Sequence, residues 1–168
     1  MTPSTQESQI AKFLYGMEES DITAVRSAVA EGVDVNSPLQ NSQYEGLTPL
    51  MLCAEWGNSD MCRELMALGA NPHATVHDHL KITALGNAAY NGQGDVCRLL
   101  LEKSPPLQHI HGAIALARSG RKTFGKDSRR DDRYRDVLNA LLWARDGIGL
   151  PGAVIKVVAG EHPEIDRA

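Results

Sequence analysis

The chain has 168 residues, of which 42% are hydrophobic and 23% charged, a balance that excludes wholesale disorder. Its net charge of -4 favours no particular partner, and only 5% of the residues are aromatic, so we expect an aliphatic core. Three cysteines are too few for a disulfide framework and favour a reducing, cytoplasmic compartment. The sequence shows no signal peptide and no apolar run that could span a membrane.

The most informative feature is an internal repeat. Residues 1–9 are polar, and we expect them to be disordered. Further on, two segments match at an offset that places Thr48 on Thr83, Gly57 on Gly92 and Cys62 on Cys97. Repetition at such a period is typical of stacked arrays.

Each repeated segment predicts two short helices. Thr48 can cap a helix that begins at Pro49, and Gly57 can end it in the left-handed conformation. A second helix carries an apolar stripe and ends at Gly69. A single helix pair cannot bury both of its faces, so we expect the pairs to stack.

These residues carry a family resemblance. Thr48-Pro49-Leu50, followed by Cys53-Ala54, Gly57 and Gly69-Ala70-Asn71, resembles an ankyrin repeat, strongly over residues 43–75, moderately over 78–104 and as a degenerate match over 11–36. A fourth unit would combine a helix over 111–120, ended by Gly120, with Val137-Leu138 and Leu141-Leu142. The resemblance implies an all-α ankyrin-repeat solenoid with about four helix-turn-helix units, of which the first and last are degenerate. The domain would span residues 10–147, with repeats near 10–41, 42–76, 77–106 and 107–147.

The repeat signal stops after Gly147. Leu150-Pro151-Gly152 opens an apolar stretch that we expect to form a short capping helix or, as the alternative, a strand. Residues 148–168 are therefore interpreted as a C-terminal cap and a tail, the tail being disordered from residue 161.

A basic segment, residues 121–135, is inserted between the two expected helices of the fourth repeat. Residues 118–136 hold eight basic and four acidic residues, and the acids argue against a nucleic-acid site. The simplest interpretation is a solvated loop whose charges pair with one another. The alternative is a docking loop for an acidic partner, which could bury Phe124 and Tyr134.

No catalytic motif is present, so we expect neither an enzyme nor a cofactor. Cys62 and Cys97 share one repeat position and are expected to be buried thiols. The histidines near the second loop are expected to be polar loop residues, and the alternative is a metal site formed by His73, His77, Asp78 and His79.

The resemblance implies that a partner contacts the residues beside the glycine before each Thr and the residues before each helix-ending glycine. In this sequence those positions are Tyr44, Glu45, Leu47, Glu55 and Trp56 in the second repeat, His79, Leu80, Ile82, Tyr90 and Asn91 in the third, Glu18 and Glu19 in the first and Arg118 in the fourth. The apolar members lie off the core stripes, and Trp and Tyr are common binding anchors. Alternatively, Trp56 or Ile82 packs against a neighbouring repeat.

We therefore expect a non-enzymatic protein–protein interaction module, monomeric when free, that binds a partner protein in a concave groove. The glutamates would favour a partner with a basic surface. Neither nucleic acid nor a membrane is expected as a partner. The alternatives are an inhibitor or immunity-type protein that neutralises a toxin or enzyme, a bacterial effector, and a metal-binding protein that uses the histidine loop.

Overall fold

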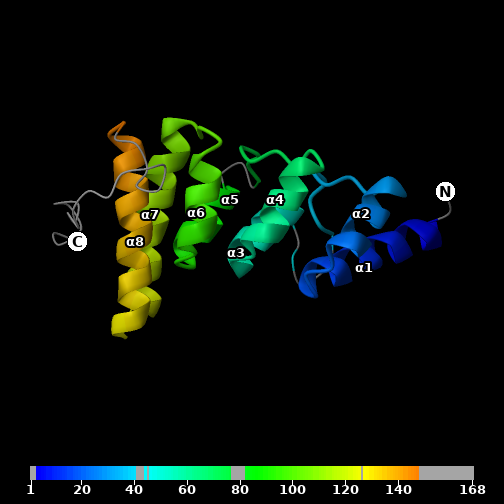
Figure 1. Cartoon of the computed structure of the whole chain (residues 1–168), viewed down its shortest axis with the longest axis horizontal. Helices are drawn as coiled ribbons and strands as arrows, with labels where there is room; N and C mark the ends of the chain where they lie inside the picture. The colour runs from blue at the N-terminus through cyan, green and yellow to red at the C-terminus, as the bar shows by residue number, and fades with distance from the viewer. Residues whose placement is uncertain (1–2, 41–43, 45, 77–81, 126, 148–168) are drawn as a thin grey trace.

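A computed structural model describes residues 3–40, 44, 46–76, 82–125 and 127–147. This part of the chain forms eight α-helices arranged as four consecutive pairs (Figure 1). Their bounds are α1 Pro3–Glu18, α2 Ile22–Ala30, α3 Pro49–Trp56, α4 Ser59–Ala67, α5 Ala84–Tyr90, α6 Gly94–Leu101, α7 Leu107–Phe124 and α8 Ser128–Arg145.

The pairs follow one another in chain order along the longest axis of the molecule (Figure 1). Helix α5 packs between α3 and α7, and α6 packs between α4 and α8, so the first and second helices of successive pairs form two layers. This arrangement confirms the prediction of an all-α solenoid of about four stacked helix pairs.

The residues that begin and end the best repeat act as the sequence predicts. The Thr48 hydroxyl accepts a hydrogen bond from the backbone N–H of Met51 at 3.3 Å, and Pro49 is the first helical residue. Gly57 follows α3 with a φ of 79°, the left-handed conformation that closes a last helical turn. Both helix ends are therefore specified locally.

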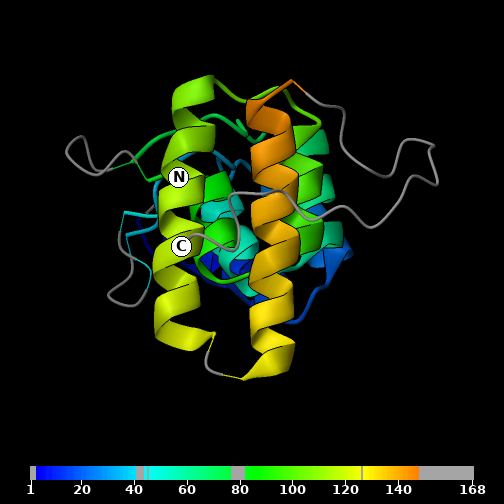
Figure 2. The same cartoon turned by 90° about the vertical axis from the view of Figure 1, so that its left-hand side faces the viewer.

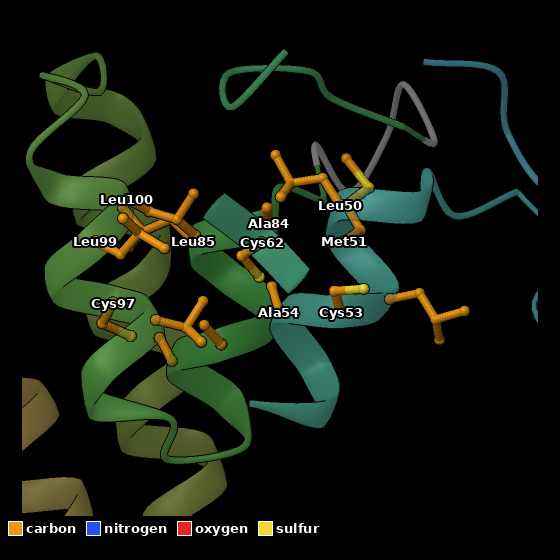
Figure 3. Packing of buried hydrophobic residues seen from close by; sticks show 14 of the residues in the cluster. Leu50, Met51, Cys53, Ala54, Cys62, Ala84, Leu85, Cys97, Leu99 and Leu100 are labelled. Carbon is orange, nitrogen blue, oxygen red and sulfur yellow. The ribbon is translucent and has the colours of Figure 1, made fainter. Parts of the chain in front are cut away.

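One continuous apolar core runs through the stack, from Phe13 and Met17 in α1 to Leu141 and Leu142 in α8. Figure 3 shows part of it, where Ala54 and Cys62 from the second pair and Leu85 from the third lie between those two pairs. Stacking thus buries the apolar faces that a lone pair would expose.

The cysteines belong to this core. All three are buried and free of disulfides. Burial raises the pKa of the Cys62 thiol to about 12 and raises the pKa values of Cys53 and Cys97 as well. The prediction that Cys62 and Cys97 are buried thiols is confirmed.

Two ion pairs link neighbouring repeats across the layer of second helices. Arg26 in α2 donates two hydrogen bonds to the Glu64 carboxylate in α4, at 2.7 and 2.8 Å. Arg98 in α6 donates to Asp136 in α8 at 2.6 Å. Both pairs therefore tie a second helix to the second helix of the next repeat.

The prediction of a disordered segment at residues 1–9 is wrong for residues 3–9, which belong to α1. Pro3 stands at the first helical position, where its missing N–H costs nothing, and no glycine or proline interrupts the following residues until Gly16. The helix is attached to α2 through Lys12, which donates hydrogen bonds to Ser27 and Glu31 at 3.1 and 2.9 Å. Polarity alone does not prevent a helix here.

The prediction of a basic loop at residues 121–135 is also wrong. Helix α7 continues to Phe124 and α8 already begins at Ser128, so most of the segment is helical. The two long helices lie side by side and extend beyond the other helices at one end of the stack (Figures 1 and 2). We call this extension, residues 118–136 with the exception of the undescribed residue 126, the hairpin arm.

Gly120 does not end α7, as the sequence interpretation expects, but lies within it. A Cβ atom at this position would overlap the backbone carbonyl oxygen of Tyr90 at the end of α5. Gly120 is therefore a close-approach residue between two repeats. The capping segment expected at residues 148–168 lies outside the described residues.

Candidate protein-binding surface

The chain folds back on itself immediately before each capping threonine. Before Thr48, the backbone N–H of Leu39 donates to the carbonyl of Leu47 at 2.8 Å. Before Thr83, Val76 and Ile82 exchange two backbone hydrogen bonds at 3.1 Å. Leu47 and Ile82 are thus fixed where these loops join the first helices.

Near the first of these loops, residues from three elements meet. The ring of Tyr44 lies edge-on to that of Trp56, with centroids 5.8 Å apart and an interplanar angle of 79°. The Tyr44 hydroxyl donates to the Glu18 carboxylate at the end of α1, at 3.3 Å. We call Tyr44, Trp56, Glu18 and Glu55 the acidic–aromatic patch.

The pKa of Tyr44 reflects this environment. Burial is the largest cause of its increase above the ordinary value, and the negative charges of Glu18 and Glu55 raise it further. Both carboxylates therefore act on one phenol although they belong to different repeats. Among the described residues, neither glutamate forms an ion pair.

The expected contact residues are less exposed than the sequence interpretation assumes. Leu47, Trp56 and Ile82 are partly buried and pack against the core, and their contact with a partner stays a prediction. Glu18 and Glu19 at the end of α1 are exposed. Glu45, His79 and Leu80 lie outside the described residues, and their role stays a prediction.

Tyr90 and Asn91 belong to a different environment, beside the hairpin arm. The Tyr90 ring lies edge-on to Phe124, with centroids 5.7 Å apart, and its carbonyl accepts a hydrogen bond from the Tyr134 hydroxyl at 2.8 Å. Asn91 donates to the carbonyl of Asn87 at 3.0 Å. Arg118 is half-buried on α7. The predicted positions therefore do not form one cluster with the acidic–aromatic patch.

A comparison with known protein families agrees with this architecture. A family described as ankyrin repeats (3 copies) matches residues 7–114, well over half of the chain. The chain belongs to the ankyrin-repeat family. Ankyrin repeats are protein–protein interaction modules, generally without enzymatic activity. A search of proteins with curated functions finds no match to this chain.

The matched residues of this ankyrin-repeat protein end within α7. The later part of α7 and all of α8 complete a fourth helix pair beyond the match, and they include the hairpin arm. None of the described helices is both long and apolar enough to cross a membrane.

The histidine loop is only partly described. His73 has a buried Nδ1 atom without a hydrogen-bond partner, and its ring centroid is 6.4 Å from that of the buried His109. Across the described ranges, no three side chains of His, Cys, Asp or Glu gather closely enough to hold a metal ion. His77, Asp78 and His79 lie outside these ranges, so the metal hypothesis gains no support from the described residues.

Of the predicted contact positions, Asn91 alone lines a cavity between the end of α5 and the hairpin arm. It has a volume of about 250 Å³ and is lined by Asn91, Gly92, Phe124, Arg130, Arg133 and Tyr134. A signal for these helices was present in the sequence, because the apolar spacing of the fourth repeat continues from Ala117 to Phe124 and from Tyr134 to Leu138. That spacing is helical, whereas the charges suggested a loop.

Proposed function

We propose that this ankyrin-repeat protein binds a basic segment of a partner protein at the acidic–aromatic patch, without catalysis and without a cofactor. The observation that carries the proposal is the meeting of a paired Tyr44 and Trp56 with two carboxylates, Glu18 and Glu55. The three cysteines are free thiols, which supports the further proposal of a reducing, cytoplasmic compartment. We propose that the free protein is a monomer.

The chemistry of the patch favours arginine in the partner. A guanidinium group can stack on an aromatic ring while it donates hydrogen bonds to a neighbouring carboxylate, and a cation over such a ring contributes about 0.5–2 kcal/mol. Tyr44 and Trp56 already contact each other, so little conformational freedom is lost when a partner binds. Glu19, exposed beside Glu18, adds a negative charge that speeds the approach of a basic partner.

The sharpest test removes the negative charges of the patch glutamates while keeping side chains of the same size. In the full-length double variant Glu18→Gln/Glu55→Gln, the amide oxygen at position 18 can still accept the Tyr44 hydrogen bond. Glu102→Gln is the matched control, because Glu102 is an exposed glutamate directly after α6 in the other layer of helices.

The wild-type chain is used to capture partners from a lysate, and each captured protein is then titrated with the three chains at low and high salt. We expect the double variant to bind about tenfold more weakly at low salt, because the negative charges of Glu18 and Glu55 are gone. Its affinity should also depend much less on salt than that of the wild type. The control should match the wild type. Partners that bind the double variant as tightly as the wild type would contradict the proposal.

An inhibitor or immunity-type protein is the alternative within the same binding mode. The clustered glutamates could occupy the basic, polyanion-binding surface of a toxin or enzyme. A stoichiometric complex that abolishes the activity of the captured partner would favour this role, and a complex that leaves the activity intact would favour scaffolding. A bacterial effector would instead capture a protein of the host.

A further inference from the structure

The cavity between the end of α5 and the hairpin arm has an apolar wall formed by Tyr134 and Phe124. Tyr134 is buried and its hydroxyl is bonded to the Tyr90 carbonyl, while Phe124 leans edge-on against the Tyr90 ring. Phe124 nevertheless keeps 40% of its surface exposed, although it is a large apolar side chain. Both rings of the wall are therefore held by contacts with Tyr90, and the wall remains partly uncovered.

The charged residues that line this cavity are both arginines. Arg133 makes no ion pair with the described residues, and Arg130 has only a long contact of 3.9 Å with Asp127. Elsewhere on the same helices, by contrast, Arg121 is held by Asp131 at 2.7 Å. The positive charges of Arg130 and Arg133 at the cavity are thus largely uncompensated, whereas the charge of Arg121 is neutralised by Asp131.

A second cavity of about 180 Å³ adjoins the first and shares Gly92 and Arg133 with it. This neighbour is lined by Asp95 and Asp136, which are both bonded to Arg98. Carboxylates there would repel an anionic ligand. An anion is consequently favoured only on the Phe124 side of Arg133.

We propose that the cavity between Phe124, Arg130 and Arg133 binds an acidic segment of a partner protein, one in which Asp or Glu neighbours an apolar side chain. The apolar side chain would cover Phe124, and the carboxylates would pair with the two guanidinium groups. A volume of about 250 Å³ is below the range of pockets that enclose whole small molecules, and suits one large side chain.

A protein segment fits this site better than a nucleic acid. A phosphate chain laid along the arm would pass the acidic residues Asp127, Asp131, Asp132 and Asp136, whereas a short peptide needs only the two arginines. The site also has the opposite charge preference from the acidic–aromatic patch. The cavity site is therefore independent of the proposed function. If binding at the acidic–aromatic patch were disproved, the proposal for the cavity would still stand.

The test starts from a random 12-residue peptide library displayed on phage and selected on the full-length chain. Selected peptides are synthesised with a fluorescent label, and their affinities are measured by anisotropy. We expect enrichment of Asp and Glu next to an apolar residue. The variants Arg130→Gln/Arg133→Gln and Phe124→Ala should each weaken binding at least tenfold.

The matched control is Lys122→Gln/Arg129→Gln, which removes two exposed charges from the same arm without touching the cavity lining. It should bind within about twofold of the wild type, as should Glu18→Gln/Glu55→Gln. Three results would overturn the proposal: peptides without acidic enrichment, equal losses in the control and in the cavity variant, or tighter binding of a 12-nucleotide single-stranded DNA than of the peptides. Urea unfolding of each variant verifies that its fold is retained.

Discussion

Two glycines in α7 provide a direct test of how the hairpin arm is joined to the stack. Gly112 and Gly120 both lie inside this helix, so replacement by Ala offers the same intrinsic gain of about 1 kcal/mol at each position. A Cβ atom at Gly112 would meet nothing within 4 Å. At Gly120 it would overlap the Tyr90 carbonyl oxygen and lie 2.9 Å from the Tyr134 ring.

The two substitutions should therefore have opposite signs. Gly112→Ala should raise the free energy of unfolding by up to about 1 kcal/mol. Gly120→Ala should lower it by about 1–3 kcal/mol, because the obstacle is backbone and α7 itself must move away from α5. The added Cβ atom also displaces the Tyr134 ring, whose hydroxyl donates a hydrogen bond to Tyr90 worth about 1 kcal/mol.

Urea unfolding followed by circular dichroism at 222 nm measures both effects, with the wild type and the two variants at one protein concentration. The urea dependence of the unfolding free energy should stay constant, so that midpoint shifts report stability. If Gly120→Ala proved as stable as Gly112→Ala, the close contact between α7 and α5 would be refuted. The arm would then not be seated on the third repeat as described.

Three further predictions concern the stack itself. Thr48→Ala should lower the free energy of unfolding, measured with urea, by about 1 kcal/mol, because the N–H of Met51 loses its hydrogen-bond acceptor. Thr48→Ser keeps a hydroxyl at this position and should retain most of that stability. Iodoacetamide at pH 8 should label the native chain very slowly, since the pKa of the buried Cys62 thiol is about 12, and labelling should accelerate at the urea midpoint. The hydrogen bonds from Arg26 lower the pKa of Glu64 below 4.5, so their stabilisation is present above pH 4.5 and is lost as the pH falls through the folded-state pKa. The stability difference between wild type and Arg26→Gln should accordingly be clear at pH 7 and shrink toward pH 3.

The features that the sequence predicts well are those decided by a few neighbouring residues. Thr48 caps a helix through an N–H three residues away, and Gly57 ends it through its own left-handed backbone. Both outcomes are set within the repeat, although a Cβ atom at Gly57 would also overlap the side chain of Gln93 in the next repeat. The burial of Cys62 and Cys97 follows from the apolar stripe of the second helix in each repeat.

The features that it misses depend on distant partners. Gly120 resembles Gly57 in sequence, yet its role is set by the Tyr90 carbonyl thirty positions earlier. The charges of the basic segment suggest a solvated loop. In the structure Arg121 on α7 donates a hydrogen bond to Asp131 on α8, so charges from the two helices pair across the turn that joins them. Trp56 lies off the apolar stripe of its own helix and is nevertheless half-buried by its surroundings.

The length of the last two helices also bears on the role of the arm. Helices α7 and α8 have 18 residues each, whereas α5 and α6, on which they stack, have seven and eight. Covering the third repeat does not require this excess, and each additional ordered residue costs roughly 1–2 kcal/mol of backbone entropy. Contacts that help to offset this cost are the Tyr134 hydrogen bond, the ring pair of Tyr90 with Phe124 and the ion pair of Arg121 with Asp131. An arm that served only to cap the array would need a polar outer face and nothing more. A partly exposed aromatic ring beside two arginines without close ion pairs is instead what the proposed acidic partner segment requires.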